Sequence, residues 1–326
     1  MTFVVSNDVE EALASGAPIV ALETAVLTAG LPRTPWNDSY GECPATIDPT
    51  LSINVALAQE MTKVVRSNGA LPAWIAVVDG VLRIGLCPEE VSSLCKDQHA
   101  GKVSLATFAQ TMQSKNSAGT TVAATLLACR LTSPKQPIRV FATGGIGGLH
   151  QNWSNRLDIS ADLTALATTP TCVVASGAKS ILDIPATVEA LETIGVPVLG
   201  LGTAQFPRFI EKNISEDPAI HQVSSPLEIA SICKHHWNDL SLHSALLATV
   251  PAPSGVALEQ GALINALTKA EAQWATLHQP SARRTPYLLD AMATITKGKS
   301  LVANLALLCN NAKVAAKIAV VYTSTV

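Results

Sequence analysis

Glu23 ends the apolar run Pro18–Leu22, a position that suits an acid catalyst. A carboxyl group that such a run withdraws from water has a raised pKa and can donate a proton near neutral pH. A buried salt-bridge partner is the ordinary alternative, and the pattern leaves both readings open. His150, which comes directly after a glycine cluster, presents the same choice.

Lys179 comes shortly after the apolar run 171–175, in the segment Ser176-Gly-Ala-Lys. Few carboxylates lie near it in the sequence, so the amine could be partly desolvated, although the pattern favours a solvated lysine on a loop. Desolvation favours the neutral amine, which is the form that attacks a carbonyl carbon. The alternative is a solvated lysine on a surface loop.

Asp158-Ile-Ser-Ala-Asp162 carries two carboxylates four positions apart. If this segment opens a helix, the two side chains share one face, where one carboxylate and several waters could hold a hard divalent cation. The alternative is helix capping, with Asp158 or Ser160 accepting from free backbone N–H groups.

The glycine cluster Thr143–Gly148 follows the apolar run 138–142. Bare backbone N–H groups in such a turn suit phosphate or another oxyanion. The cluster fits neither the dinucleotide-binding nor the P-loop pattern, so nucleotide binding does not follow. A plain tight turn is the alternative.

Short strands and longer helical segments alternate along the chain and must position these residues. We predict strands at 18–22, 74–78, 81–84, 138–142, 171–175 and 197–201, and helices at 56–68, 120–131, 188–194, 286–296 and 301–321. This alternation predicts an α/β fold with a mainly parallel sheet. Because functional groups collect at the carboxyl ends of parallel strands, we expect Glu23, the glycine cluster and Lys179 to meet there.

Three further segments have local signatures. Asp79-Gly80 predicts the turn of a hairpin. The stretches 31–52 and 211–226 are predicted to be loops, and His235-His236 an exposed helix face.

Composition restricts the class of protein. Of 326 residues, 48% are hydrophobic and 14% charged, which suffices for a large aliphatic core. The net charge of -3 provides no electrostatic footprint for nucleic acid. The seven scattered cysteines predict buried thiols in a reducing compartment. No apolar run approaches the ~18 residues of a membrane span, and the N-terminus has no secretory pattern. We therefore expect a cytoplasmic protein with neither a membrane nor a nucleic acid as its partner.

The chemistry-bearing segments, taken in order, resemble one family, the pseudouridine-5'-phosphate glycosidases, also called indigoidine synthase A-like proteins. The similar segments are VSNDVEEALASGAPIVALET (5–24), GTTVAAT (119–125), FATGGIGGLH (141–150), LDISADLTALATTP (157–170), SGAKSILDIPATVEALETIGVPVLGLGT (176–203), FPRF (206–209), TPYLL (285–289) and KSLVANLALLCNNAKVAAKIA (299–319). They span nearly the whole chain.

The resemblance implies one three-layer α/β/α domain covering residues 1–326, usually assembled as a homotrimer. It implies a lyase or hydrolase of pseudouridine catabolism and nucleotide metabolism that reversibly cleaves pseudouridine 5'-phosphate into uracil and ribose 5-phosphate. One Mn²⁺ per subunit is expected, and other divalent cations have similar ligand preferences. A carbon–carbon bond is broken, which accounts for the need for an amine that forms an imine.

The resemblance also assigns roles to single residues. Lys179 is the expected nucleophile, forming a Schiff base with C1' of the ribose, Glu23 the proton donor, and Asp158 the manganese ligand. The expected substrate contacts are Lys102 at the phosphate, His150 and Asn304 beside the uracil or ribose, and Val122, Ser160, Ala161 and Asp162 along the site.

Two features depart from the family pattern. Leu105-Ala-Thr107 stands where two arginines and an aspartate are usual, and the loop 31–52 is longer. Two alternatives remain: a related Schiff-base lyase acting on another sugar phosphate or C-nucleotide, and a non-catalytic binding relative. Retention of the acid, the metal ligand and the lysine argues against the second.

Overall fold

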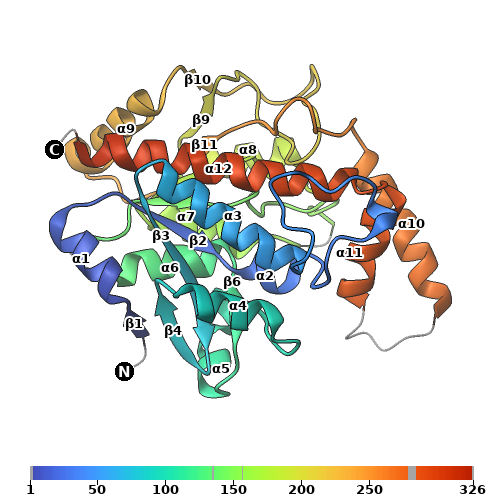
Figure 1. Cartoon of the computed structure of the whole chain (residues 1–326). Helices are drawn as coiled ribbons and strands as arrows, with labels where there is room; N and C mark the ends of the chain where they lie inside the picture. Colours follow the sequence, from blue (N-terminus) through green and yellow to red (C-terminus); the bar gives the residue numbers. More distant parts are fainter. Residues whose placement is uncertain (1–2, 134–135, 156, 278–283, 325–326) are drawn as a thin grey trace.

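The computed structural model describes residues 3–133, 136–155, 157–277 and 284–324 (Figure 1). Its centre is a sheet with the order β1-β4-β3-β2-β7-β8-β11-β9-β10, and β6 joins β5 to β3. The strands are β1 (Phe3–Val5), β2 (Ile19–Glu23), β3 (Leu71–Val78), β4 (Val81–Ile84), β5 (Gly101–Val103), β6 (Ala118–Thr120), β7 (Val140–Ala142), β8 (Cys172–Ala175), β9 (Val198–Leu201), β10 (His221–Val223) and β11 (Leu246–Thr249).

The sheet is mainly parallel, as predicted. Among the described strands, the antiparallel pairs are β3 with β4 and β3 with β6. Asp79 and Gly80 join β3 to β4 with positive φ angles of 49° and 77°, which a tight two-residue hairpin turn requires. The predicted hairpin is therefore confirmed.

Helices cover both faces of the sheet. The α-helices are α1 (Asn7–Ser15), α2 (Ala25–Ala29), α3 (Ile53–Ser67), α4 (Pro88–Lys96), α5 (Phe108–Gln113), α6 (Val122–Leu131), α7 (Ala161–Thr168), α8 (Ile184–Thr193), α9 (Pro226–Lys234), α10 (Ala262–Leu277), α11 (Arg284–Ile295) and α12 (Lys299–Ser324). Short turns η1 (Asp38–Tyr40), η2 (Leu105–Thr107) and η3 (His235–Asp239) lie between them.

The alternating side chains of β2 show the layers. Val20 and Leu22 belong to the core beneath α3 and α12, whereas Ile19 and Ala21 belong to the core shared with α6 and α7. Successive strand residues point to opposite faces, so one apolar strand supplies both cores. The predicted three-layer α/β/α arrangement is confirmed (Figure 1).

The C-terminal helix α12 is long and apolar enough, by length and composition, to cross a membrane. However, half of its most apolar stretch is buried inside the protein, and α12 packs against α3, α9 and β7. Burial of this kind is how the core helix of a globular domain behaves.

Several local predictions need correction. The segment 211–226 is not all loop, because it contains β10, which extends the sheet beside β9. His236 is buried rather than exposed, and its Nε2 shares a hydrogen bond of 2.9 Å with Ser244 Oγ. The seven cysteines are free thiols, as predicted, but Cys87 is exposed and Cys43 and Cys309 are half-buried.

Candidate active site

The carboxyl ends of β2, β7 and β8 lie side by side and open into a cavity of about 690 Å³. These strands are parallel neighbours, so the segments that follow them meet at one edge, as predicted. Nine of the ten predicted site residues line the cavity: Glu23, Lys102, Val122, His150, Ser160, Ala161, Asp162, Lys179 and Asn304. Asp158 is not among its lining residues.

Glu23 is a half-buried carboxyl with a hydroxyl donor. Thr143 Oγ1 donates a hydrogen bond to Glu23 Oε1. Loss of hydration raises the Glu23 pKa to about 7. The Thr143 hydrogen bond and the charge of Lys179 both lower this pKa, but their effects are smaller. No ion pair in the described part of the chain includes Glu23, so the structure favours an acid with a raised pKa over a salt-bridge partner.

Lys179 is exposed, and its side chain reaches the cavity wall. This agrees with the solvated loop lysine that the pattern favours, and not with partial desolvation. Lys179 does have a carboxyl neighbour in space, because Glu23 lies close enough for the Lys179 charge to lower the Glu23 pKa. The two groups follow different strands, so their closeness follows from the predicted parallel sheet and not from nearness along the chain.

The loop that carries Lys179 is fixed by close backbone contacts. Gly177 has a φ of +66°, and a Cβ there would collide with the Pro207 carbonyl. Ile146 N donates to Gly177 O at 3.0 Å, and Lys179 N donates to Ile146 O at 3.2 Å. The glycine is thus required both for its left-handed conformation and for the close approach of the next loop.

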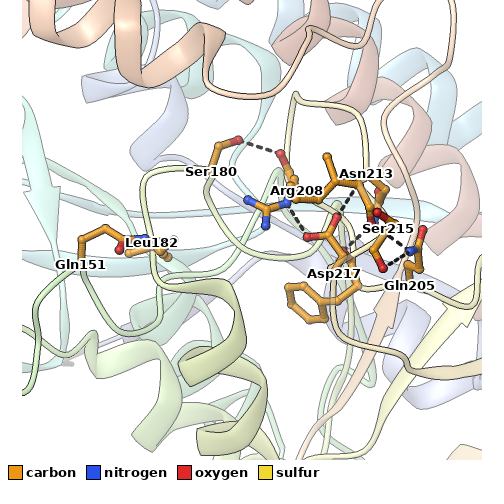
Figure 2. Close-up of polar contacts among 10 residues, drawn as sticks. Gln151, Ser180, Leu182, Gln205, Arg208, Asn213, Ser215 and Asp217 are labelled. Atoms are coloured by element: carbon orange, nitrogen blue, oxygen red, sulfur yellow. Dashed lines mark hydrogen bonds and ion pairs between the residues drawn. The ribbon is translucent and has the colours of Figure 1, made fainter.

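A polar network joins this loop to the segment around Arg208, as Figure 2 shows. Ser180 Oγ donates to Arg208 O at 2.6 Å. Arg208 Nε pairs with the buried Asp217 carboxylate, whose second oxygen accepts from Ile214 N at 2.9 Å. These contacts hold the FPRF segment (206–209) against the loop that carries Lys179, which gives that segment a structural role.

Asn311 of α12 connects the ends of β7 and β8. Its buried Nδ2 donates to Thr143 O at 2.8 Å and lies 3.2 Å from Ser176 Oγ. The side chain therefore ties the residue that contacts Glu23 to the loop that carries Lys179. This buried amide therefore bonds to backbone at a point that orients the site.

Both carboxylate oxygens of Asp162 accept backbone hydrogen bonds, so this side chain links α6 to the glycine cluster. Oδ1 accepts from Ala123 N at 3.0 Å and Oδ2 from Gly147 N at 2.8 Å. Ser160 caps α7 by accepting from Asp162 N at 3.2 Å. The helix begins at Ala161, so the expectation that Asp158 and Asp162 share a helical face is wrong and capping is confirmed.

The glycine cluster behaves mainly as a packed turn. The N–H groups of Thr143, Ile146 and Gly147 bond to Val174 O, Gly177 O and Asp162 respectively. A Cβ at Gly147 would collide with Ser160 Oγ, and one at Gly148 with Thr187. Close packing therefore accounts for these glycines better than an oxyanion cradle does.

An anion could instead be received at the start of α6. Thr121 Oγ1 is buried and lacks a hydrogen-bond partner in the described part of the chain. Thr121, Val122, Lys102 and Ser104 line one side of the cavity. A helix N-terminus with a nearby lysine suits a phosphate group. Thr121 was not among the predicted site residues, although its place at the start of a helix was a usable signal.

An apolar part of the cavity wall comes from α10, α11 and α12. Its side chains include Leu263, Leu267, Leu288, Leu289 and Met292. Asn304 and Ser300 add polar groups there. The sequence alone does not reveal this wall, because leucines at helical spacing indicate a core as readily as a binding site.

Asp158 lies beside the cavity, with an exposed side chain. Its backbone oxygen accepts from His150 N at 3.1 Å, which places it next to a lining residue. No cluster of three or more His, Cys, Asp or Glu residues with metal-site spacing occurs in the part of the chain that the structure describes. A single solvated carboxylate fits a hard divalent cation that retains most of its waters, and it does not fit a cation that requires a closed protein cage.

Known proteins resemble this chain along its length. The sequence model described as "Indigoidine synthase A like protein" matches residues 48–321. A protein of Glaesserella parasuis named pseudouridine-5'-phosphate glycosidase is 38% identical, with 97% of each chain covered. One of Rhizobium johnstonii, named pseudouridine-5'-phosphate glycosidase 2, is 40% identical, covering 97% of this chain and 95% of its own.

Two solved structures share the fold at 29% identity. An indigoidine synthase A-like protein from Thermotoga maritima superposes with a TM-score of 0.78, covering 98% of this chain and 97% of its own. The prealnumycin C-glycosynthase AlnA, in complex with ribulose 5-phosphate, superposes with a TM-score of 0.80, covering 100% of this chain and 98% of its own.

Proposed function

The chain belongs to the indigoidine synthase A-like family, and we propose on that basis that it cleaves pseudouridine 5'-phosphate reversibly into uracil and ribose 5-phosphate. The relatives that are 38% and 40% identical over nearly their whole length carry that activity in their names. The observation that carries the proposal is the juxtaposition of Glu23, whose pKa is about 7, with Lys179 on the wall of one cavity.

The proposed reaction uses both groups. Lys179 Nζ forms a bond to C1' as the bond from C1' to the ring oxygen breaks, and Glu23 gives that oxygen a proton. The bond between C1' and C5 of uracil then breaks. Glu23 takes a proton from the Lys179 nitrogen and gives it to C5, which keeps the electron pair of the broken bond, while the nitrogen lone pair forms the C=N bond of the imine. Water hydrolyses the imine to ribose 5-phosphate and restores the Lys179 amine.

The phosphate is proposed to lie at the start of α6. Lys102 and Lys179 are the cationic side chains on the cavity wall, and only Lys102 lies with Thr121 and Val122. Leu105, where an arginine is usual in the family, contributes instead to the apolar core around α6. Phosphate recognition here therefore depends on Lys102, the Thr121 hydroxyl and backbone N–H groups. His150, Ser160 and Asn304 are proposed to contact the ribose and base.

The experiment that tests the activity is direct. Purified protein is incubated with pseudouridine 5'-phosphate and Mn²⁺, and uracil is followed by chromatography. Release of uracil together with an equal amount of ribose 5-phosphate supports the proposal. Absence of uracil from folded, metal-loaded protein contradicts it.

A second candidate, formation of a carbon–carbon glycosidic bond to an aromatic acceptor, is favoured by the apolar wall and by the likeness to AlnA. It uses the same lysine in the reverse direction. Incubation with ribose 5-phosphate and either uracil or a polycyclic phenol separates the two candidates. Glycosidase activity predicts that ribose 5-phosphate gives a product with uracil and none with the phenol.

A divalent cation, Mn²⁺ in the first instance, is proposed to bind at Asp158. The ion would supply positive charge beside the substrate, and Asp158 would hold it with waters in the other positions. We expect Asp158→Asn to weaken Mn²⁺ binding by roughly tenfold or more, because the only proposed anionic ligand is lost. Electron paramagnetic resonance of free Mn²⁺ measures this without substrate. Asp183→Asn, at the cap of α8, is the control, and equal weakening in both variants would contradict the assignment.

The pH dependence of kcat/KM should report Glu23. A proton donor must be protonated, so activity is expected to fall as pH rises through the Glu23 pKa of about 7. The Thr143 hydrogen bond favours the charged carboxylate and lowers this pKa. Thr143→Val should therefore shift the falling limb to higher pH. A limb that remains in Glu23→Gln would assign the titration to another group.

Assembly and location are also proposed from the family resemblance: a homotrimer, with one domain per subunit, in the cytoplasm. The seven free thiols support a reducing compartment. Sedimentation velocity tests the assembly, and a monomeric mass at micromolar concentration would contradict it.

A further inference from the structure

The long loop 31–52 has a fixed internal structure. Arg33 donates to the carbonyl oxygens of Thr28 and Ala100, the latter at 2.8 Å, and so ties the start of the loop to α2 and β5. Trp36 Nε1 donates to Gly41 O at 2.8 Å. The Trp36 and Tyr40 rings meet edge to face, with centroids 5.7 Å apart. These hydrogen bonds and the ring contact therefore hold the loop in a defined conformation.

Tyr40, at the centre of this loop, reaches α11. The residue is 1% exposed, and its hydroxyl donates to Asp290 Oδ1 across 250 positions of sequence. Its backbone lies against the turn between α11 and α12, where a Cβ at Gly298 would collide with Tyr40 O. Two contacts thus join the loop to the helix pair.

The same helix forms part of the apolar wall. Asp290 directly follows Leu288 and Leu289, which line the cavity, and Met292 lines it one turn later. Helix α10 packs against α11, and the two are called the α10–α11 hairpin here. Glu211 holds the start of α10 by accepting a hydrogen bond from Leu263 N at 2.9 Å. The hairpin therefore has one attachment at Glu211 and another at Tyr40.

We propose that Tyr40 is a positioning residue that, through Asp290, holds α11 over the cavity and sets the affinity for the base half of the substrate. The kinetic part of this inference rests on the proposed glycosidase function. In this proposal the leucine wall receives the base and would contact it in the ground state and the transition state alike. Losing such uniform binding raises KM while kcat stays unchanged.

Kinetics of Tyr40→Phe, Asp290→Ala and the double variant test the proposal. Each single variant should raise KM for pseudouridine 5'-phosphate roughly threefold to tenfold, the range for one hydrogen bond, with kcat changed less than about twofold. The double variant should show no further increase, because both changes remove the same contact. An unchanged KM, or effects that multiply, would overturn the proposal.

Thr62→Val is the matched control. It removes the 2.9 Å hydrogen bond from Trp74 Nε1 to Thr62 Oγ1, and neither residue lines the cavity. This variant should leave KM unchanged. A similar rise in KM would show that general loss of stability, rather than the position of α11, causes the effect.

Hydrogen exchange measured without substrate keeps the two proposals separable. Tyr40→Phe and Asp290→Ala should increase exchange in α11, and Thr62→Val should not. Exchange that is unchanged in α11, or increased equally across the sheet, would overturn the role of Tyr40. If the wild type releases no uracil, the proposed function fails, and this measurement alone decides the inference.

Discussion

Replacing Lys179 by alanine is expected to abolish uracil release, with kcat falling at least about a thousandfold, because the covalent step has no substitute nucleophile. Borohydride added during turnover should trap ribose 5-phosphate on the wild-type chain and not on Lys179→Ala. The lysine reaches the cavity wall next to Glu23, and its loop is fixed by Gly177 and Ile146. No other lysine on the described wall has Glu23 as a neighbour.

Lys179→Arg is the informative control. It keeps the positive charge beside Glu23 but cannot form an imine, so it should be as inactive as the alanine variant. Mass spectrometry of the trapped protein locates the adduct. An adduct on Lys102, the other lysine on the cavity wall, would assign the nucleophile there, and activity retained by Lys179→Arg would show that the residue acts by charge alone.

Glu23→Gln is the second large effect that we expect, with a fall in kcat of roughly 10² to 10⁴, the range for loss of a positioned general acid. Glutamine preserves the shape of the carboxyl and can still meet the Thr143 hydroxyl. KM should therefore change little. Substrate binding in the absence of turnover is measured by calorimetry in the same variant.

The stability of Glu23→Gln separates chemistry from folding. In the wild type, burial works against the charged carboxylate, so the neutral amide should unfold at an equal or higher denaturant concentration near pH 8. A marked loss of stability would mean that the lost activity reflects a damaged fold. Full activity would remove Glu23 from the mechanism.

Local sequence patterns predicted most of the scaffold. The apolar runs that became β2, β3, β7, β8 and β9 were visible because buried strands need continuous β-branched and aliphatic residues. The hairpin turn at Asp79-Gly80 was predictable because few residues tolerate positive φ. The parallel sheet then placed Glu23 and Lys179 at one edge without any knowledge of distances.

Local patterns failed where the partner was remote. Asp158 and Asp162 look equivalent in sequence, yet Asp162 is consumed by the N–H groups of Ala123 and Gly147 while Asp158 is exposed. Lys179 has few carboxylates near it along the chain, yet Glu23 lies close to it in space. The segment 211–226 looked like loop, yet β10 forms there because β9 offers it an edge.

The sequence by itself therefore determined the fold class, the strand ends that carry the chemistry, and the family to which the chain belongs. Only the tertiary structure decided which carboxyl has a raised pKa, which aspartate remains exposed, and which helices form the apolar wall. The contacts from Thr143 to Glu23 and from Tyr40 to Asp290 span 120 and 250 positions. Local propensity acts over a few residues, whereas hydration, charge proximity and packing depend on which distant segments the fold brings together.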